Sequence, residues 1–171
     1  MPAEWHDWHD FYMLLGTASA ALVALLFVAV SIGASFITPE RSTATRTFMS
    51  PVVFHFSTLL LLSLVALVPV HTTISLAVGI ALVAIAGLGY STVVLVGLAR
   101  ASVKDTADRF GLCPLAAYLA VLAAAGMISL PALGADILAA AALVLLAVNI
   151  RNTGDLMLAF ARQIASRSLD T

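Results

Sequence analysis

Long runs of apolar residues without a charged side chain constrain this chain more than any other feature. One of them occupies residues 11–37 and contains no Asp, Glu, Lys or Arg. A helix needs about 20 mostly apolar residues to cross the hydrocarbon core of a bilayer. Over the whole chain 62% of the residues are hydrophobic and 10% are charged, whereas soluble domains average about 45–50% and about 25%. The sequence therefore predicts an integral membrane protein and excludes a soluble globular fold or a disordered chain.

Five segments are long enough, or nearly long enough, to cross a membrane as helices, at residues 11–37, 51–70, 73–98, 114–133 and 136–158. The fifth segment carries its helical pattern through Asn149 and continues to about residue 165 as an amphipathic cytoplasmic tail. The expected fold class is all-α. We expect a polytopic membrane protein whose single transmembrane domain, residues 1–171, is a bundle of five transmembrane helices.

Prolines mark several expected helix boundaries. Ser50 and Pro51 predict the start of the second helix, because serine caps helix N-termini and proline fits the first helical position. Residues 38–49 are expected to form a separate, short surface helix. Pro131 predicts a tight turn between the fourth and fifth helices, with Asp136 as the cap of the fifth.

The positive residues predict the orientation in the membrane. With five spans, all eight fall on one side, at Arg41, Arg46, Arg100, Lys104, Arg109, Arg151, Arg162 and Arg167. Cytoplasmic loops carry an excess of Lys and Arg. We therefore expect the N-terminus outside, the C-terminus in the cytoplasm and a multi-pass location in the plasma (inner) membrane, as in small membrane proteins of the bacterial type.

A tandem Trp-His-Asp repeat precedes the first segment at residues 5–10. At helical spacing its tryptophans, histidines and aspartates form three stripes. Tryptophan concentrates at membrane surfaces, so one interpretation is an interfacial anchor. Imidazole and carboxylate groups together also suit a divalent metal, and the candidate ligands are His6, Asp7, His9, Asp10 and His71. A haem held at this outer face by His71 with His6 or His9 is a further interpretation.

The same outer side carries acidic residues and no basic ones. The acidic residues are Glu4, Asp7, Asp10 and Asp136. Without Lys or Arg to offset them, they would concentrate cations. In a symmetric oligomer they would form rings, as at the mouths of cation channels. The sequence thus predicts an acidic outer mouth.

Polar residues recur at one depth, near the cytoplasmic side, on four of the five predicted helices. The candidates for lining a pore or gate are His55, Tyr90, Tyr118, Asn149, Arg151 and Asp155. Ionisable residues at such depth usually face a bundle interior or a wet cavity. Simpler explanations exist for each of them. Arg151 can snorkel to water or pair with Asp155, the tyrosines can be interfacial, and a neutral His55 can bond to a carbonyl or hydroxyl.

Several functional classes are excluded or disfavoured. The spans contain no Ser–Lys pair and no paired carboxylates, and the chain has no Gly-rich phosphate loop and no His-Glu-x-x-His motif. We therefore expect no catalytic residues and no enzyme activity, and we predict no cofactor beyond the metal or haem interpretation. Eight Lys and Arg against nine Asp and Glu provide no basic field for nucleic acid.

The leading hypothesis is a homo-oligomeric ion channel or small-solute transport protein. A single bundle of this size leaves little room for a water-filled pore, so channel function would require an oligomer. Small residues on two segments favour helix packing in lipid, at Gly16, Ala20, Ala24, Ala116, Ala120 and Ala124. The alternatives are a non-catalytic accessory or scaffold subunit of a larger membrane complex, and the metal- or haem-binding protein.

Overall fold

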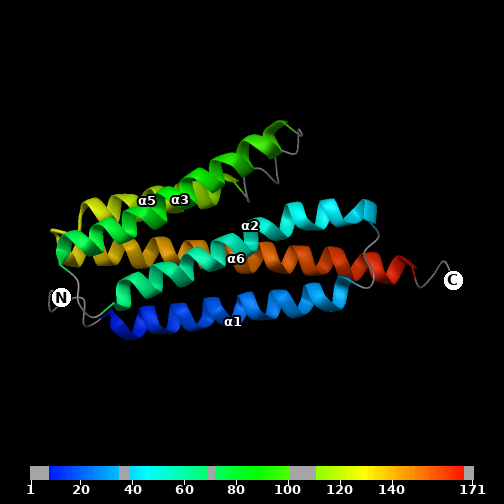
Figure 1. Cartoon of the computed structure of the whole chain (residues 1–171), viewed down its shortest axis with the longest axis horizontal. Coiled ribbons are helices and arrows are strands. Elements are labelled where there is room, and N and C mark those ends of the chain that lie inside the picture. The colour runs from blue at the N-terminus through cyan, green and yellow to red at the C-terminus, as the bar shows by residue number, and fades with distance from the viewer. Residues whose placement is uncertain (1–7, 35–38, 69–71, 101–110, 168–171) are drawn as a thin grey trace.

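The computed structural model describes residues 8–34, 39–68, 72–100 and 111–167, and in these residues every regular element is a helix (Figure 1). The helices are α1 (His9–Ala34), α2 (Pro39–Leu67), α3 (Thr73–Arg100), α5 (Cys113–Gly126) and α6 (Pro131–Arg167). They form an elongated bundle in which α1, α3 and α6 run one way and α2 and α5 run the other. An all-α fold with five helices is therefore confirmed for the described part of the chain.

Three helices are long and apolar enough to cross a membrane, over His9–Ala29, Thr73–Arg100 and Ala132–Asp155. At about 1.5 Å per residue, the shortest of them matches a hydrocarbon core of about 30 Å. The other two helices contain shorter apolar stretches, Pro51–Leu67 and Cys113–Gly126. Many large apolar side chains are exposed on the outside of the bundle, among them Leu14, Leu25, Phe27, Ile74, Leu82 and Val93. Such a surface suits lipid better than water, and the fold is compatible with a membrane protein.

Four of the helices close a ring in which each contacts two neighbours. α2 packs against α3 and α6, and α5 packs against the same two helices. We call this arrangement the four-helix ring. α1 lies outside it and packs along α2. The inward-facing side chains of α2, α3, α5 and α6 therefore meet in one interior.

A narrow buried stripe runs along α6. Its most deeply buried residues, each at most 1% exposed, are Ala135, Leu138, Ala142, Leu145, Asn149 and Asn152, and Ala139 and Ala141 beside them are 4% exposed. The spacing of the most deeply buried residues alternates between three and four residues, which is the spacing of helices that pack side by side with a left-handed twist. The stripe is apolar where α6 begins and becomes polar at Asn149. The ring interior thus has an apolar half and a polar half along this helix.

α2 begins at Pro39, and Pro51 lies inside it. One helix covers both the segment expected to form a surface helix and the segment expected as the second span, so the prediction that Ser50 caps a new helix at Pro51 is wrong. Proline already has a helical φ, and its missing N–H removes one internal hydrogen bond, to the carbonyl of Thr47. A helix that is stabilised on both sides can continue through that loss, as membrane helices often do.

α5 ends at Gly126, earlier than the sequence pattern indicated. The N–H of Met127 closes the helix on the carbonyl of Ala123 at 3.0 Å. The chain then turns, and α6 starts at Pro131, where the missing N–H of proline costs nothing. Pro131 therefore opens the last helix, and the prediction that Asp136 caps that helix is wrong because Asp136 lies inside it.

α6 is one helix through Asn149, as its continuous pattern predicted. The arginines within the described helices are Arg41, Arg46, Arg100, Arg151, Arg162 and Arg167. They belong to the start of α2, the end of α3 and the second half of α6, which all lie toward the same end of the bundle (Figure 1). Lys104 and Arg109 lie outside the described residues. The orientation in a membrane stays a prediction.

Candidate functional site

The four-helix ring buries a group of polar side chains that includes three of the predicted residues. His55 on α2 and Tyr118 on α5 are each 1% exposed, and Tyr90 on α3 is partly buried beside them. Nδ1 of His55 lies 2.9 Å from the hydroxyl oxygen of Tyr118. The ring centroids of His55 and Tyr90 are 6.0 Å apart. The structure thus brings these three side chains together from three helices.

Thr58 joins this group, one helical turn after His55. Its hydroxyl donates a hydrogen bond to the carbonyl oxygen of His55 at 2.8 Å, and it is also hydrogen-bonded to the hydroxyl of Tyr118. We call His55, Thr58 and Tyr118 the histidine cluster. Thr58 was not among the predicted residues, although its spacing of three from His55 places both on one helix face and could have indicated it.

The close approach of α3 and α5 at this cluster depends on Gly87. A Cβ at this position would overlap the aromatic ring of Tyr118. Because glycine has no side chain, the Tyr118 ring lies directly against the α3 backbone while its hydroxyl reaches α2. One turn along, Tyr90 stacks on Phe54 with ring centroids 3.9 Å apart. Aromatic rings therefore flank the histidine cluster.

α6 contributes two buried amides, Asn149 and Asn152, which are 0% and 1% exposed. Within the described residues, Oδ1 and Nδ2 of Asn149 have no hydrogen-bond partner, and Nδ2 of Asn152 has none either. We call these residues the asparagine pair. α6 itself packs against α2 and α5, the two helices that carry the histidine cluster. Asn149 was predicted, whereas Asn152 was missed despite following it by one turn.

Other buried polar atoms also lack a hydrogen-bond partner among the described residues. They include Nε2 of His55, Oγ of Ser91 on α3 and Oγ of Ser19 on α1. In a bilayer core no bulk water compensates such groups, so each one costs free energy. Ser19 lies on α1, outside the ring. The remaining atoms belong to α2, α3 and α6, three helices of the ring, and together they define the candidate site.

The two charged residues predicted at the same depth lie elsewhere. Arg151 and Asp155 are exposed on α6, whereas Asn152 between them in the sequence is buried. Their side chains therefore lie on the outer surface of this chain. The structure does not bring them to the histidine cluster.

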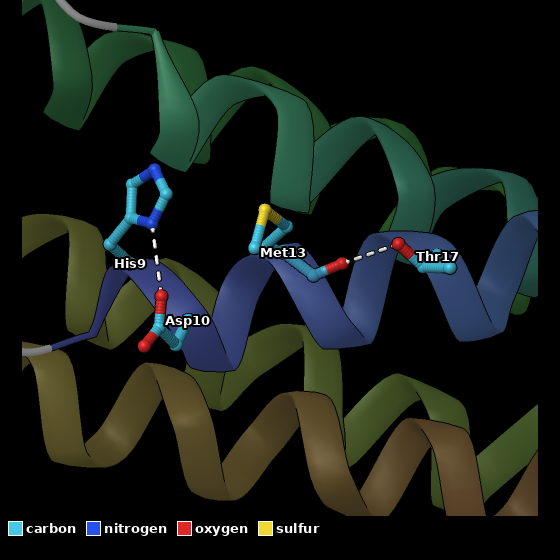
Figure 2. Close-up of polar contacts among 4 residues, drawn as sticks. All are labelled: His9, Asp10, Met13 and Thr17. Carbon is cyan, nitrogen blue, oxygen red and sulfur yellow. Dashed lines mark hydrogen bonds and ion pairs between the residues drawn. The ribbon is translucent and has the colours of Figure 1, made fainter.

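At the start of α1, His9 and Asp10 are exposed, and His9 Nδ1 lies 3.3 Å from Asp10 Oδ1 (Figure 2). Further along α1, the hydroxyl of Thr17 donates to the carbonyl of Met13 at 2.8 Å. Asp136 is exposed near the start of α6. The other outer candidates lie outside the described residues: Glu4, His6, Asp7 and His71. Within the described residues no three His, Cys, Asp or Glu side chains form a group that could hold a metal.

No known family model matches the chain, and neither does any curated protein or solved structure. Over its described residues the chain is all-α, with three apolar helices long enough to span a membrane, and it buries polar side chains within a ring of four helices.

Proposed function

We propose that the chain is a membrane transport protein that passes small polar solutes or ions and works as a homo-oligomer. The supporting observation is the set of buried atoms without partners in the described ring, including Nε2 of His55, Oγ of Ser91 and both amide atoms of Asn149. Unpartnered polar groups are rare in native folds and call for an explanation. A solute or water that contacts them in passage provides one.

The chemistry of the site favours an uncharged solute. Among the side chains that the structure describes, which exclude those of residues 32–50 and 159–167, no Asp, Glu, Lys or Arg is buried. The site offers imidazole, hydroxyl and amide groups. Amides and hydroxyls both donate and accept hydrogen bonds, which suits a small uncharged polar molecule. An ion would instead pass between copies, along the exposed Arg151 and Asp155 and past an acidic mouth that includes Asp10 and Asp136. Of these two routes, we propose the passage of uncharged solutes along the polar side chains inside the ring of each copy.

Small exposed residues support the homo-oligomer. Ala20 and Ala24 on α1 and Ala116 on α5 are exposed, so packing within one chain leaves them uncovered. Small side chains allow helices of two copies to approach closely in lipid. The oligomeric state in lipid nanodiscs, measured by native mass spectrometry, tests this part. A closed ring of copies is expected, and a monomer would refute it.

Reconstitution into liposomes tests the transport function. Wild-type protein should accelerate the equilibration of water, urea or glycerol, measured by light scattering. Asn149→Leu should lower that flux strongly, because it removes a buried amide from the site. The matched control is Ile150→Leu, the next residue, which is exposed and should leave the flux unchanged. Wild-type vesicles with neither solute flux nor ion current would refute transport, whereas current without solute flux would favour the route between copies.

We place the protein in the plasma (inner) membrane with the C-terminus in the cytoplasm. The arginines of the described helices support this orientation, since they lie toward one end of the bundle and positive residues favour the cytoplasmic side. A green fluorescent protein fused to the C-terminus should fluoresce in cells, because it folds in the cytoplasm. A dark fusion at the C-terminus would contradict the orientation.

An accessory or scaffold subunit is the second candidate, and α6 favours it. The helix continues to Arg167, past Asp155, where its candidate span ends. In Figure 1 its red end extends beyond α1. A helix that projects from the bundle offers a surface for a partner. Gentle detergent extraction should then recover a partner protein at fixed stoichiometry, whereas a homogeneous homo-oligomer alone would contradict this role.

A further inference from the structure

The hydrogen bonds of the histidine cluster determine where its protons lie. Oγ1 of Thr58 is 2.8 Å from the carbonyl oxygen of His55, which can only accept, so the threonine donates its single proton there. The hydrogen bond between Thr58 and Tyr118 must then use the proton of the tyrosine. The oxygen of Tyr118 accepts in turn from Nδ1 of His55 at 2.9 Å. The three side chains form a closed circuit in which Nδ1 carries the proton.

This circuit leaves one atom without a role. When Nδ1 of a neutral imidazole carries the proton, Nε2 has a lone pair and can only accept. Nε2 of His55 is buried and has no hydrogen-bond partner among the described residues. The circuit also fixes the direction of this lone pair, because a flipped ring would lose its hydrogen bond to Tyr118. A fixed, buried acceptor without a donor is suited to binding a molecule that provides one.

We propose that Nε2 of His55 is the acceptor in a binding site for one small uncharged hydrogen-bond donor, an O–H or N–H molecule such as water or formamide. A role of this site as the solute-binding step of transport rests on the proposed function. The binding of a donor molecule to the protein at rest can be measured without any flux.

The surroundings of His55 favour an uncharged occupant. The rings of Phe54, Tyr90 and Tyr118 have centroids 5.7, 6.0 and 5.6 Å from that of His55. Among the side chains that the structure describes, which exclude those of residues 32–50, the titratable groups that face it are Tyr90 on α3 and Tyr118 on α5, and no Asp or Glu is buried. A cation bound at Nε2 would therefore lack a counter-charge in a region of low dielectric constant. A neutral donor satisfies the lone pair without that cost.

The test is ¹⁵N NMR on the full chain, labelled at its four histidines, in lipid nanodiscs at neutral pH. The His55 signals are those lost in His55→Gln. The expected result is a protonated Nδ1 and an unprotonated Nε2 whose resonance is shifted by an accepted hydrogen bond. A cross-peak between Nε2 and water protons identifies water as the occupant. A shift that appears only when formamide is added identifies a solute.

Two NMR results would overturn the proposal: a proton on Nε2, or an Nε2 resonance that shows no hydrogen bond with and without formamide. The liposome assay separates this outcome from the proposed function. A bound donor in protein that carries no flux would refute transport and leave the site standing. Solute flux through protein whose Nε2 binds nothing would refute the site alone.

Thr58→Val tests whether the circuit sets the tautomer. Valine offers no acceptor, so the hydroxyl proton of Tyr118 should turn to Nδ1 of His55, and the imidazole proton should move to Nε2. The expected result is loss of the unprotonated Nε2 signal. The control is Ser57→Ala, because Ser57 is adjacent in sequence and takes no part in the circuit; its tautomer should match the wild type. An unchanged tautomer in Thr58→Val would overturn the proton assignment on which the site depends.

Discussion

The four-helix ring holds two groups of buried polar side chains, and they differ in how their hydrogen bonds are used. In the histidine cluster the side chains of α2 and α5 satisfy one another, apart from Nε2 of His55. In the asparagine pair on α6, three amide atoms have no partner among the described residues. Satisfied buried hydrogen bonds specify how helices pack, whereas unsatisfied groups cost stability. The histidine cluster therefore joins α2 to α5, whereas the asparagine pair makes no such connection through these three atoms.

Gly87→Ala should lower the free energy of unfolding most strongly, because it disturbs the packing that positions the histidine cluster. The added Cβ would overlap the ring of Tyr118, and overpacking of this kind costs about 1–3 kcal/mol. The free energy of unfolding in mixed micelles measures it. The control is Gly89→Ala on the same helix, where a Cβ meets nothing within 4 Å and should stabilise the helix by up to about 1 kcal/mol. Equal effects at the two glycines would show that α3 and α5 do not depend on this contact.

Tyr118→Phe should have the next largest effect, since it removes the hydroxyl that joins His55 to Thr58. The buried Nδ1–H of His55 then has no acceptor, which costs about 1–3 kcal/mol. The same unfolding measurement applies, with Thr58→Val and the double variant completing a cycle. The two substitutions should be non-additive because they break one circuit. Additive losses would contradict the hydrogen-bonded cluster.

The sequence predicted α1, α3 and the continuation of α6 past Asn149 well, and the boundaries of α2 and α5 less well. α1, α3 and α6 follow from uncharged runs or a continuous helical pattern, which few alternative folds could accommodate. The boundaries of α2 and α5 depend on Pro51 and Pro131, and a proline is compatible with either a helix start or a helix interior. Only the hydrogen bonds and packing on both sides decide between these. A local pattern does not contain that information.

The residues of the candidate site were likewise predicted only in part. Counting residues from the helix ends placed His55 and Tyr118 at one depth, and a hydroxyl partner was among the explanations for the histidine. The direction in which a side chain points around the helix depends on its neighbours. Arg151 is therefore exposed while Asn152 is buried. The role of Gly87 was also beyond prediction, because only the position of the Tyr118 ring on another helix gives that glycine its function.

Asn149→Leu should reverse the sign of the effect seen with Tyr118→Phe. The amide of Asn149 has no hydrogen bond to lose within the described residues, and leucine removes a buried polar group that costs free energy. We expect the free energy of unfolding to rise by about 1 kcal/mol while solute flux falls, a trade between stability and function. Destabilisation as large as that of Tyr118→Phe would show that the asparagine pair is as structural as the histidine cluster.

Asp10→Asn should have the smallest effect on folding. The carboxylate is 95% exposed beside His9 at the start of α1, and exposed pairs contribute little to stability, so the unfolding midpoint should not change. If the outer end concentrates cations, the variant should lower cation current at low salt, and the difference should disappear at high salt because ions screen exposed charges. Flux of uncharged solutes serves as the internal control and should stay at the wild-type rate. A fall in solute flux equal to that of Asn149→Leu would show that ions and uncharged solutes share one path past Asp10 and through the ring. The proposed separate route for uncharged solutes within the ring would then lose its support.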